Sequence, residues 1–153
     1  MKKIEIEVPE GKRAEWVNGV LTLVDEQPKS VMDRIKTFAD AVDALGEEHL
    51  FVKEHNNAAA IGCSADLGAY IDLRIIVAAL NEGWEPTFAE VENRWYPWFE
   101  IEDGGVSYAD AYNDSLSTNT FIGSRLAFKS RKLAEYAGKQ FIDIYKFFLC
   151  GRK

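Results

Sequence analysis

The sequence has few of the residue types that most often build metal, redox or covalent sites. Its 153 residues include two cysteines and two histidines. Cys63 and Cys150 could pair in an oxidising compartment, but two thiols in a chain without an export signal are more often reduced. His49 and His55 lack the spacing that places two metal ligands on one helical turn. We therefore expect no metal site and no cofactor, and the state of the two thiols stays open.

Long apolar runs are also missing. The first seven residues, MKKIEIE, alternate charge with isoleucine, whereas a secretory signal needs an unbroken apolar run of roughly 7–15 residues. The longest apolar stretch, at residues 75–80, is far shorter than the run of about 20 residues that spans a membrane. We expect a soluble protein without a signal peptide or a membrane partner, located in the cytoplasm or inside a larger particle.

Sequence patterns of catalysis are missing as well. No serine lies in the glycine-rich turn of a nucleophile elbow. The two Gly-Lys pairs, at 11–12 and 138–139, are followed by arginine and glutamine, whereas a phosphate-binding loop needs serine or threonine there. The 25 acidic residues could supply a carboxylate pair, but their number does not place two of them across a cleft. We expect no catalytic residue and no enzymatic activity.

Positive charge is scarce except near the end of the chain. The net charge of −7 argues against general affinity for nucleic acid, which requires clustered lysine and arginine. From Arg125 onward, however, eight basic residues accompany two acidic ones. A solvated helix face that complements an acidic neighbour explains this segment, and a nucleic-acid surface is the alternative.

The N-terminal segment has the pattern of a β-meander. Ile4, Ile6 and Val8 alternate with charged residues, which is the period of a half-buried strand. Asn18-Gly19 between two apolar-rich runs is a strong hairpin signal, because both residues tolerate positive φ. That turn would pair Trp16 with Leu21 and Ala14 with Leu23 on one apolar face. We therefore expect Trp16 to belong to the core.

The remaining pattern predicts an α+β fold in a single domain over residues 1–153. An antiparallel sheet with the N-terminal hairpin would pack against about three helices. The helices are expected at 31–45, 65–82 and 131–148, and further strands at 95–102, 106–113 and 124–129. Residues 54–63 are expected to form a connecting loop, because they are small and polar.

The stretch RWYPWFEI at 94–101 concentrates aromatic residues around one proline. Strand alternation places Trp95, Pro97, Phe99 and Ile101 on a core face and Tyr96, Trp98 and Glu100 on the other. Proline cannot donate to a ladder, so the strand lies at an edge or contains a bulge. The second face could stack a sugar ring and accept its hydroxyl protons, but we favour core packing for the aromatic residues.

Two longer segments resemble a known group of proteins. One is LNEGW at 80–84 with WYPWF at 95–99, and the other is GSRLAFKS at 123–130 with LAEYAGKQF at 133–141. Together they resemble small uncharacterised proteins found in phages and prophage-like regions of gut bacteria. The resemblance covers most of residues 64–149 and implies a mobile element or virion context, either in the host cytoplasm or in the virion. No activity is assigned to the group, so it implies no role for any residue.

The leading hypothesis is a non-enzymatic phage or prophage protein that works by interaction with a protein partner or within an assembly. The predicted contact surface is the tyrosine-bearing hairpin and loop at 103–120, which includes Tyr108 and Tyr112. One alternative is carbohydrate binding through Tyr96, Trp98 and Glu100. Another is an accessory role on nucleic acid through the basic C-terminal helix.

Overall fold

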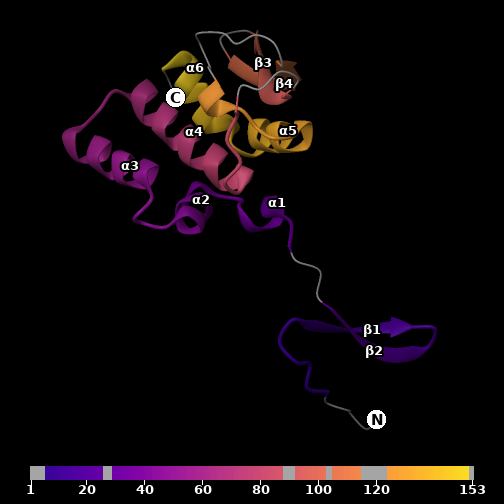
Figure 1. Ribbon diagram of the computed structural model, residues 1–153. Helices are drawn as coiled ribbons and strands as arrows, with labels where there is room; N and C mark the ends of the chain where they lie inside the picture. The colour runs from indigo at the N-terminus through magenta and orange to yellow at the C-terminus, as the bar shows by residue number, and fades with distance from the viewer. Residues whose placement is uncertain (1–5, 26–28, 88–91, 103–104, 115–123, 152–153) are drawn as a thin grey trace. The chain divides into compact units, whose positions relative to one another are not determined.

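The computed structural model describes residues 6–25, 29–87, 92–102, 105–114 and 124–151. The chain divides into two compact units, Met1–Ser30 and Val31–Lys153. The described residues form six α-helices, one 3-10 helix and two antiparallel two-stranded sheets (Figure 1). The α+β class and the N-terminal hairpin are confirmed, although the helices are more numerous than the three expected. Whether residues 1–153 act as one domain stays a prediction.

The first unit contains a β-hairpin of β1 (Lys12–Val17) and β2 (Val20–Asp25). Its register is the predicted one, with Trp16 opposite Leu21 and Ala14 opposite Leu23. The turn residues Asn18 and Gly19 have φ values of 51° and 80°, as this type of turn requires. The prediction that Trp16 belongs to the core is wrong, because its side chain is 71% exposed. Register follows from the turn, whereas burial depends on what covers the face.

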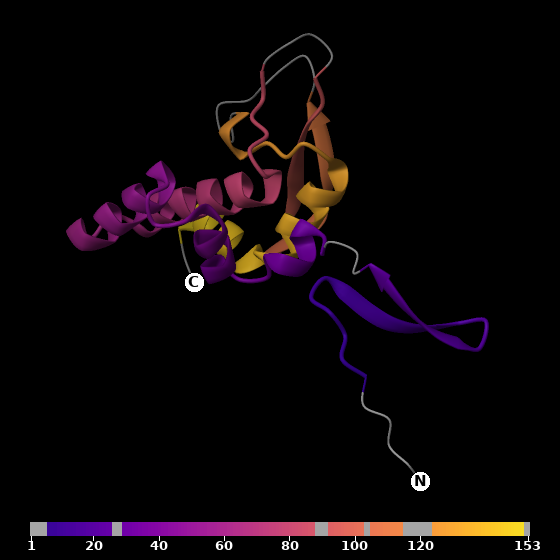
Figure 2. The same ribbon diagram turned by 60° about the horizontal axis from the view of Figure 1, so that its bottom comes forward.

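The second unit is built around helix α4 (Ala65–Asn81), which is buried on most of its circumference. This helix contacts α2 (Phe38–Leu45), α3 (Leu50–Ile61) and α6 (Ile142–Cys150). Figures 1 and 2 show α3 running alongside α4. Its fully buried residues Leu73, Ile75 and Ile76 lie in the hydrophobic core, as expected for a helix that is apolar nearly all round.

One helix and one loop predicted before α4 need correction. The helix expected at 31–45 is two helices, α1 (Val31–Arg34) and α2, because Thr37 starts a new helix through a capping box with Asp40. The loop expected at 54–63 is mostly helix α3, which ends at Gly62 in the left-handed conformation. The buried Val52 anchors α3 to the core.

The C-terminal region holds the second sheet and the last two helices. Strands β3 (Arg94–Glu102) and β4 (Gly105–Asp114) pair antiparallel, with a bulge between Trp98 and Phe99. The strand expected at 124–129 is instead the 3-10 helix η1 (Ser124–Leu126), followed by a single bridge between Phe128 and Trp95. The helix expected at 131–148 is two helices, α5 (Arg131–Gln140) and α6. Helix α5 packs against β3 and β4.

None of the helices in the described residues combines the length and the apolar character needed to cross a bilayer.

Candidate functional site

The aromatic residues of the alternative ligand platform take different positions. Tyr96 is buried, with 6% of its surface exposed, whereas Trp98 and Tyr112 are 52% and 55% exposed. The rings of Trp98 and Tyr112 lie 6.0 Å apart across the two strands and are tilted by 50°. The β3–β4 sheet therefore presents one exposed pair of aromatic rings.

The other predicted site residues are Tyr108 and Glu100. Tyr108 packs edge-on against Phe99, with ring centroids 6.2 Å apart, and Lys139 Nζ lies 4.9 Å from the centroid of its ring. Burial is the largest cause of the raised pKa of Tyr108. Glu100 is exposed on β3. Residues 103–104 and 115–120 of the predicted contact surface lie outside the described residues.

Acidic neighbours neutralise much of the basic C-terminal surface. Arg131 pairs with Asp110 at 2.6 Å and with Glu135 at 2.7 Å. Lys146 pairs with Asp143 at 3.3 Å. These ion pairs support the interpretation of this segment as a solvated helix face beside acidic groups, rather than as a surface for phosphates.

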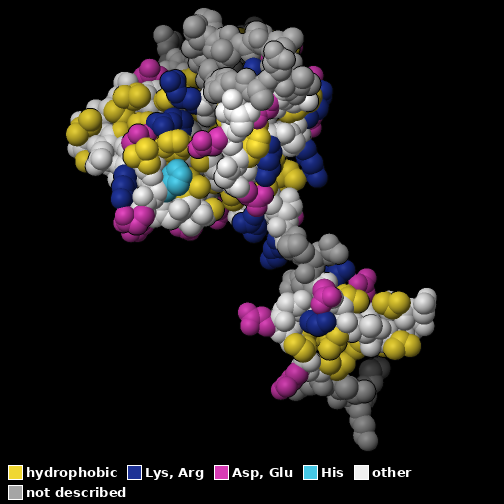
Figure 3. All heavy atoms as spheres, in the orientation of Figure 1, with side chains coloured by type: hydrophobic (Ala, Val, Ile, Leu, Met, Phe, Trp, Pro, Cys, Tyr) yellow, Lys and Arg dark blue, Asp and Glu magenta, His cyan; other side chains and the backbone are white. Residues whose placement is uncertain are grey.

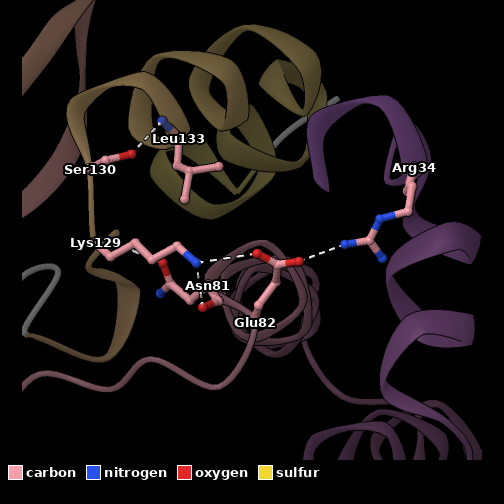
Figure 4. Close-up of polar contacts among 6 residues, drawn as sticks. All are labelled: Arg34, Asn81, Glu82, Lys129, Ser130 and Leu133. Atoms are coloured by element: carbon pink, nitrogen blue, oxygen red, sulfur yellow. Dashed lines mark hydrogen bonds and ion pairs between the residues drawn. The ribbon is translucent and has the colours of Figure 1, made fainter. Parts of the chain in front are cut away.

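A polar cluster at the end of α4 joins three segments of the second unit (Figure 4). The Glu82 carboxylate pairs with Arg34 at 2.6 Å and with Lys129 at 3.3 Å. The buried Asn81 side chain donates to the Ala127 carbonyl at 2.8 Å and accepts from the Lys129 backbone N–H at 3.1 Å. Asn81 thus fixes the segment that carries η1 against the end of α4.

The two histidines bind protein groups. His49 Nδ1 accepts a hydrogen bond from the Phe51 backbone N–H at 3.2 Å and caps α3. His55 Nδ1 lies 2.7 Å from Asp72 Oδ1, and the His55 ring packs on Phe38. Both imidazoles are half-buried. The described residues contain no group of three or more potential metal ligands, and Cys63 and Cys150 are free thiols.

A pocket of about 930 Å³ opens between the start of α3, the C-terminal half of α4, the segment after α4 and η1. Its described lining is Leu45, His49, Leu50, Phe51, Arg74, Val77, Ala78, Asn81, Gly83, Trp84, Glu85, Pro86, Arg125 and Ala127. The sequence did not predict this pocket. The signal that points to it is Arg74, an arginine in an otherwise apolar stretch without a partner on its own helix.

Arg74 is held rigidly in the wall of the pocket. Its Nη1 atom donates to Glu54 on α3 at 2.5 Å, and its guanidinium carbon lies 3.9 Å from the centroid of the Phe51 ring. Its Nε atom is buried and has no hydrogen-bond partner among the described residues. A buried donor of this kind is costly unless a ligand or water accepts its proton.

The first unit carries a second candidate surface, which we call the hairpin face: Ala14, Trp16, Leu21 and Leu23. Leu23 is 41% exposed in addition to the exposed Trp16. Hydrophobic side chains are prominent on the surface of this unit (Figure 3). At the end of the face, Lys12 and Asp25 form an ion pair of 2.8 Å, so this flank is close to neutral.

Comparisons with protein families, curated proteins and solved structures found no match to this chain.

Proposed function

We propose that this protein is a non-enzymatic interaction protein that assembles with a second copy of itself through the hairpin face. The observation that carries the proposal is the 71% exposure of Trp16 within an apolar face. Exposed apolar residues that form a contiguous face, rather than scattered ones, are typical of protein interaction sites. Tryptophan is also among the residues that most often dominate the energy of an interface.

The form of the hairpin supports a partner of the same kind. Among the described strands, β1 and β2 pair with each other and with no other strand, so both edges of the hairpin are unpaired within that part of the chain. A two-stranded hairpin is marginally stable in water unless further strands or an apolar surface cover it. Lys12 and Asp25 place one charge of each sign beside the face, so two copies related by a twofold axis would meet without net repulsion.

The resemblance to phage and prophage proteins gives the proposal its setting. Components of virions and their assembly are present in many copies, and self-association through an exposed apolar face suits that role. In this setting the hairpin, rather than the surface predicted at 103–120, would make the main contact.

Sedimentation of the full chain over a range of concentrations tests the proposal. We expect a monomer–dimer equilibrium that Trp16→Glu abolishes, because the substitution places a charge in the centre of the interface. Trp98→Glu is the matched control, since Trp98 is also exposed but lies in the second unit. A monomer at every concentration contradicts the proposal, as does a dimer that Trp98→Glu disrupts and Trp16→Glu does not.

The exposed pair of Trp98 and Tyr112 favours a second candidate function, carbohydrate binding. Rings at 6.0 Å on one face could stack on the apolar side of a sugar, with Glu100 available as an acceptor. Tryptophan fluorescence titrated with a panel of glycans is the test, with Trp98→Ala as the variant that should lose any response. The absence of a shift at millimolar sugar would exclude this function.

A further inference from the structure

We infer that the pocket between α3, α4 and η1 binds a small organic acid that has one carboxylate on an aromatic or aliphatic body. The described lining belongs wholly to the second unit, so the inference does not depend on self-association through the hairpin face. Three properties of the pocket carry it: its size, its apolar walls and the kind of polar groups it presents.

The size and the walls fit a small molecule. Ligand pockets typically measure roughly 300–1,000 Å³ and are mostly apolar with a few polar groups, and this pocket measures about 930 Å³. Apolar residues supply most of the described lining: Leu45, Leu50, Phe51, Val77, Ala78, Trp84, Pro86 and Ala127. The rings of Phe51 and Trp84 suit a flat or elongated apolar body.

The polar groups are mainly hydrogen-bond donors. Neutral His49 must carry its proton on Nε2, because Nδ1 accepts from the Phe51 N–H. Arg74 is already engaged by Glu54, and its Nε–H, which has no acceptor among the described residues, is buried away from the open space of the pocket. Asn81 has both ends of its amide engaged by the protein and contributes only shape. A ligand that enters the pocket therefore needs acceptors.

Arg125 supplies the charge that selects an acid. Its side chain is exposed, and no ion pair of Arg125 occurs among the described residues, unlike Arg74, which already pairs with Glu54. The hydrogen bond from Asn81 to the Ala127 carbonyl holds the segment that carries Arg125. An arginine held in this way can bind a carboxylate through two parallel N–H donors.

The charge balance limits the ligand to a single negative charge. Glu54 already neutralises Arg74, and Glu85 is the one acidic residue among the described lining residues. Arg125, which has no ion pair among the described residues, can compensate one negative charge on a ligand but not two or more. Glu85 can instead accept a hydrogen bond from a hydroxyl or amide N–H on the ligand. A monocarboxylate fits this arrangement, and a nucleotide or polyphosphate does not.

Titration calorimetry with matched probes tests the inference on the full chain. The probes are 2-naphthoate, 2-naphthalenemethanol, which lacks the charge, and inorganic phosphate, which lacks the apolar body. We expect naphthoate to bind at least about tenfold more tightly than the alcohol, as one charge-assisted hydrogen bond implies. Phosphate should not bind. Equal affinity for acid and alcohol, or no binding of the acid at millimolar concentration, overturns the inference.

Variants locate the binding in the pocket. Arg125→Ala removes the free guanidinium and should weaken the binding of naphthoate by about tenfold or more. Ala78→Phe places a ring on the wall of the pocket, which Ala78 lines, and should abolish binding of the acid without a change of charge. Lys132→Ala is the control, because Lys132 is exposed on α5 and does not line the pocket. A thermal melt of each variant confirms that it folds.

The nuclear magnetic resonance signal of the Trp84 indole N–H gives a second readout that does not require loss of binding. Naphthoate should shift this signal in the wild-type chain and leave it unchanged in Ala78→Phe. Unaltered affinity in Arg125→Ala contradicts the inference. So does binding of an acidic peptide at this site when naphthoate fails to bind, since the occupant would then be a protein.

Discussion

His55 on α3 and Asp72 on α4 are joined by a contact of 2.7 Å between Nδ1 and Oδ1. Both side chains are half-buried. Burial raises the pKa of the Asp72 carboxyl above its ordinary value of 3.8, and the hydrogen bond and charge of His55 oppose that effect. The pair therefore holds two central helices together while its carboxylate is partly desolvated.

The raised pKa of Asp72 makes the stability of the fold depend on pH. The folded chain binds the Asp72 proton more tightly than the unfolded chain, so this stabilisation is fully present below 3.8 and is lost as the pH rises through the folded pKa. The free energy of unfolding of the wild type should thus fall, relative to Asp72→Asn, as the pH rises above 3.8. Urea unfolding of both proteins on the two sides of that pH measures the difference. A difference that does not vary with pH contradicts the assignment.

Substitutions of two adjacent residues at the end of α4 should lower the stability of the fold by different amounts. Asn81→Ala removes a buried amide that serves the Ala127 carbonyl and the Lys129 N–H, and should cost about 3 kcal/mol. Glu82→Gln breaks the ion pairs with Arg34 and Lys129, whose partners are partly exposed, and should cost at most about 1 kcal/mol.

Denaturant unfolding of the two variants gives this comparison directly. Equal losses would mean that the Glu82 ion pairs, rather than the Asn81 amide, hold η1 and the 129–130 segment against α4. The Asn81→Ala substitution should also weaken the binding of any ligand to the pocket. It removes the side chain that holds the segment carrying Arg125.

Substitution by alanine should change the stability of the protein in opposite directions at two glycines in helices. A Cβ at Gly138 in α5 would lie 2.6 Å from Tyr108 Cδ2 and 2.7 Å from Pro97 Cβ, so Gly138→Ala should cost about 1–3 kcal/mol through overpacking. A Cβ at Gly68 in α4 meets only Cys63 Sγ, at 3.6 Å. Gly68→Ala should therefore gain up to about 1 kcal/mol from helix propensity. Thermal unfolding of both variants is the measurement, and a stabilised Gly138→Ala would show that α5 does not pack tightly on the sheet.

The hairpin shows what the sequence determines well and what it does not. The Asn18-Gly19 turn fixes the register, and the two-residue period fixes which side chains share a face, so both predictions are confirmed. Both signals are local. The burial of Trp16 depends on a surface far away in sequence or in another chain, and no local pattern reports it.

Tertiary contacts explain the segments that were predicted wrongly. Residues of α3 such as Asn56, Asn57 and Ala58 have no strong helical pattern, but Glu54 and His55 find their partners Arg74 and Asp72 on α4. At 124–129 the alternating pattern indicates a strand. There Leu126 and Phe128 are both buried, but the backbone forms a 3-10 turn and a single bridge.

Sequence patterns do not predict the pocket, for a related reason. Its described lining comes from α2, α3, α4, the segment after α4 and η1, and no two of these segments share a sequence motif. Of its polar residues, only Arg74 stood out, because Asp72 lies too close in sequence to pair with it on the same helix face. The predicted aromatic platform was a stronger local signal, but the structure buries Tyr96 and leaves the pair of Trp98 and Tyr112.

Hydrogen exchange should show that the hairpin depends on a partner. The amides of β1 and β2 form a two-stranded sheet and should exchange quickly in dilute protein, because such a sheet opens at little cost. A second copy of the chain binds only the closed hairpin. The protection of the hairpin amides from exchange should therefore increase with protein concentration. The amides around the fully buried Leu73 and Ile76 in α4 serve as the internal control and should not change. Hairpin amides that exchange at the same rate over a hundredfold range of concentration, or that are protected as strongly as those of α4 in dilute protein, would mean that the hairpin is stable without a second copy.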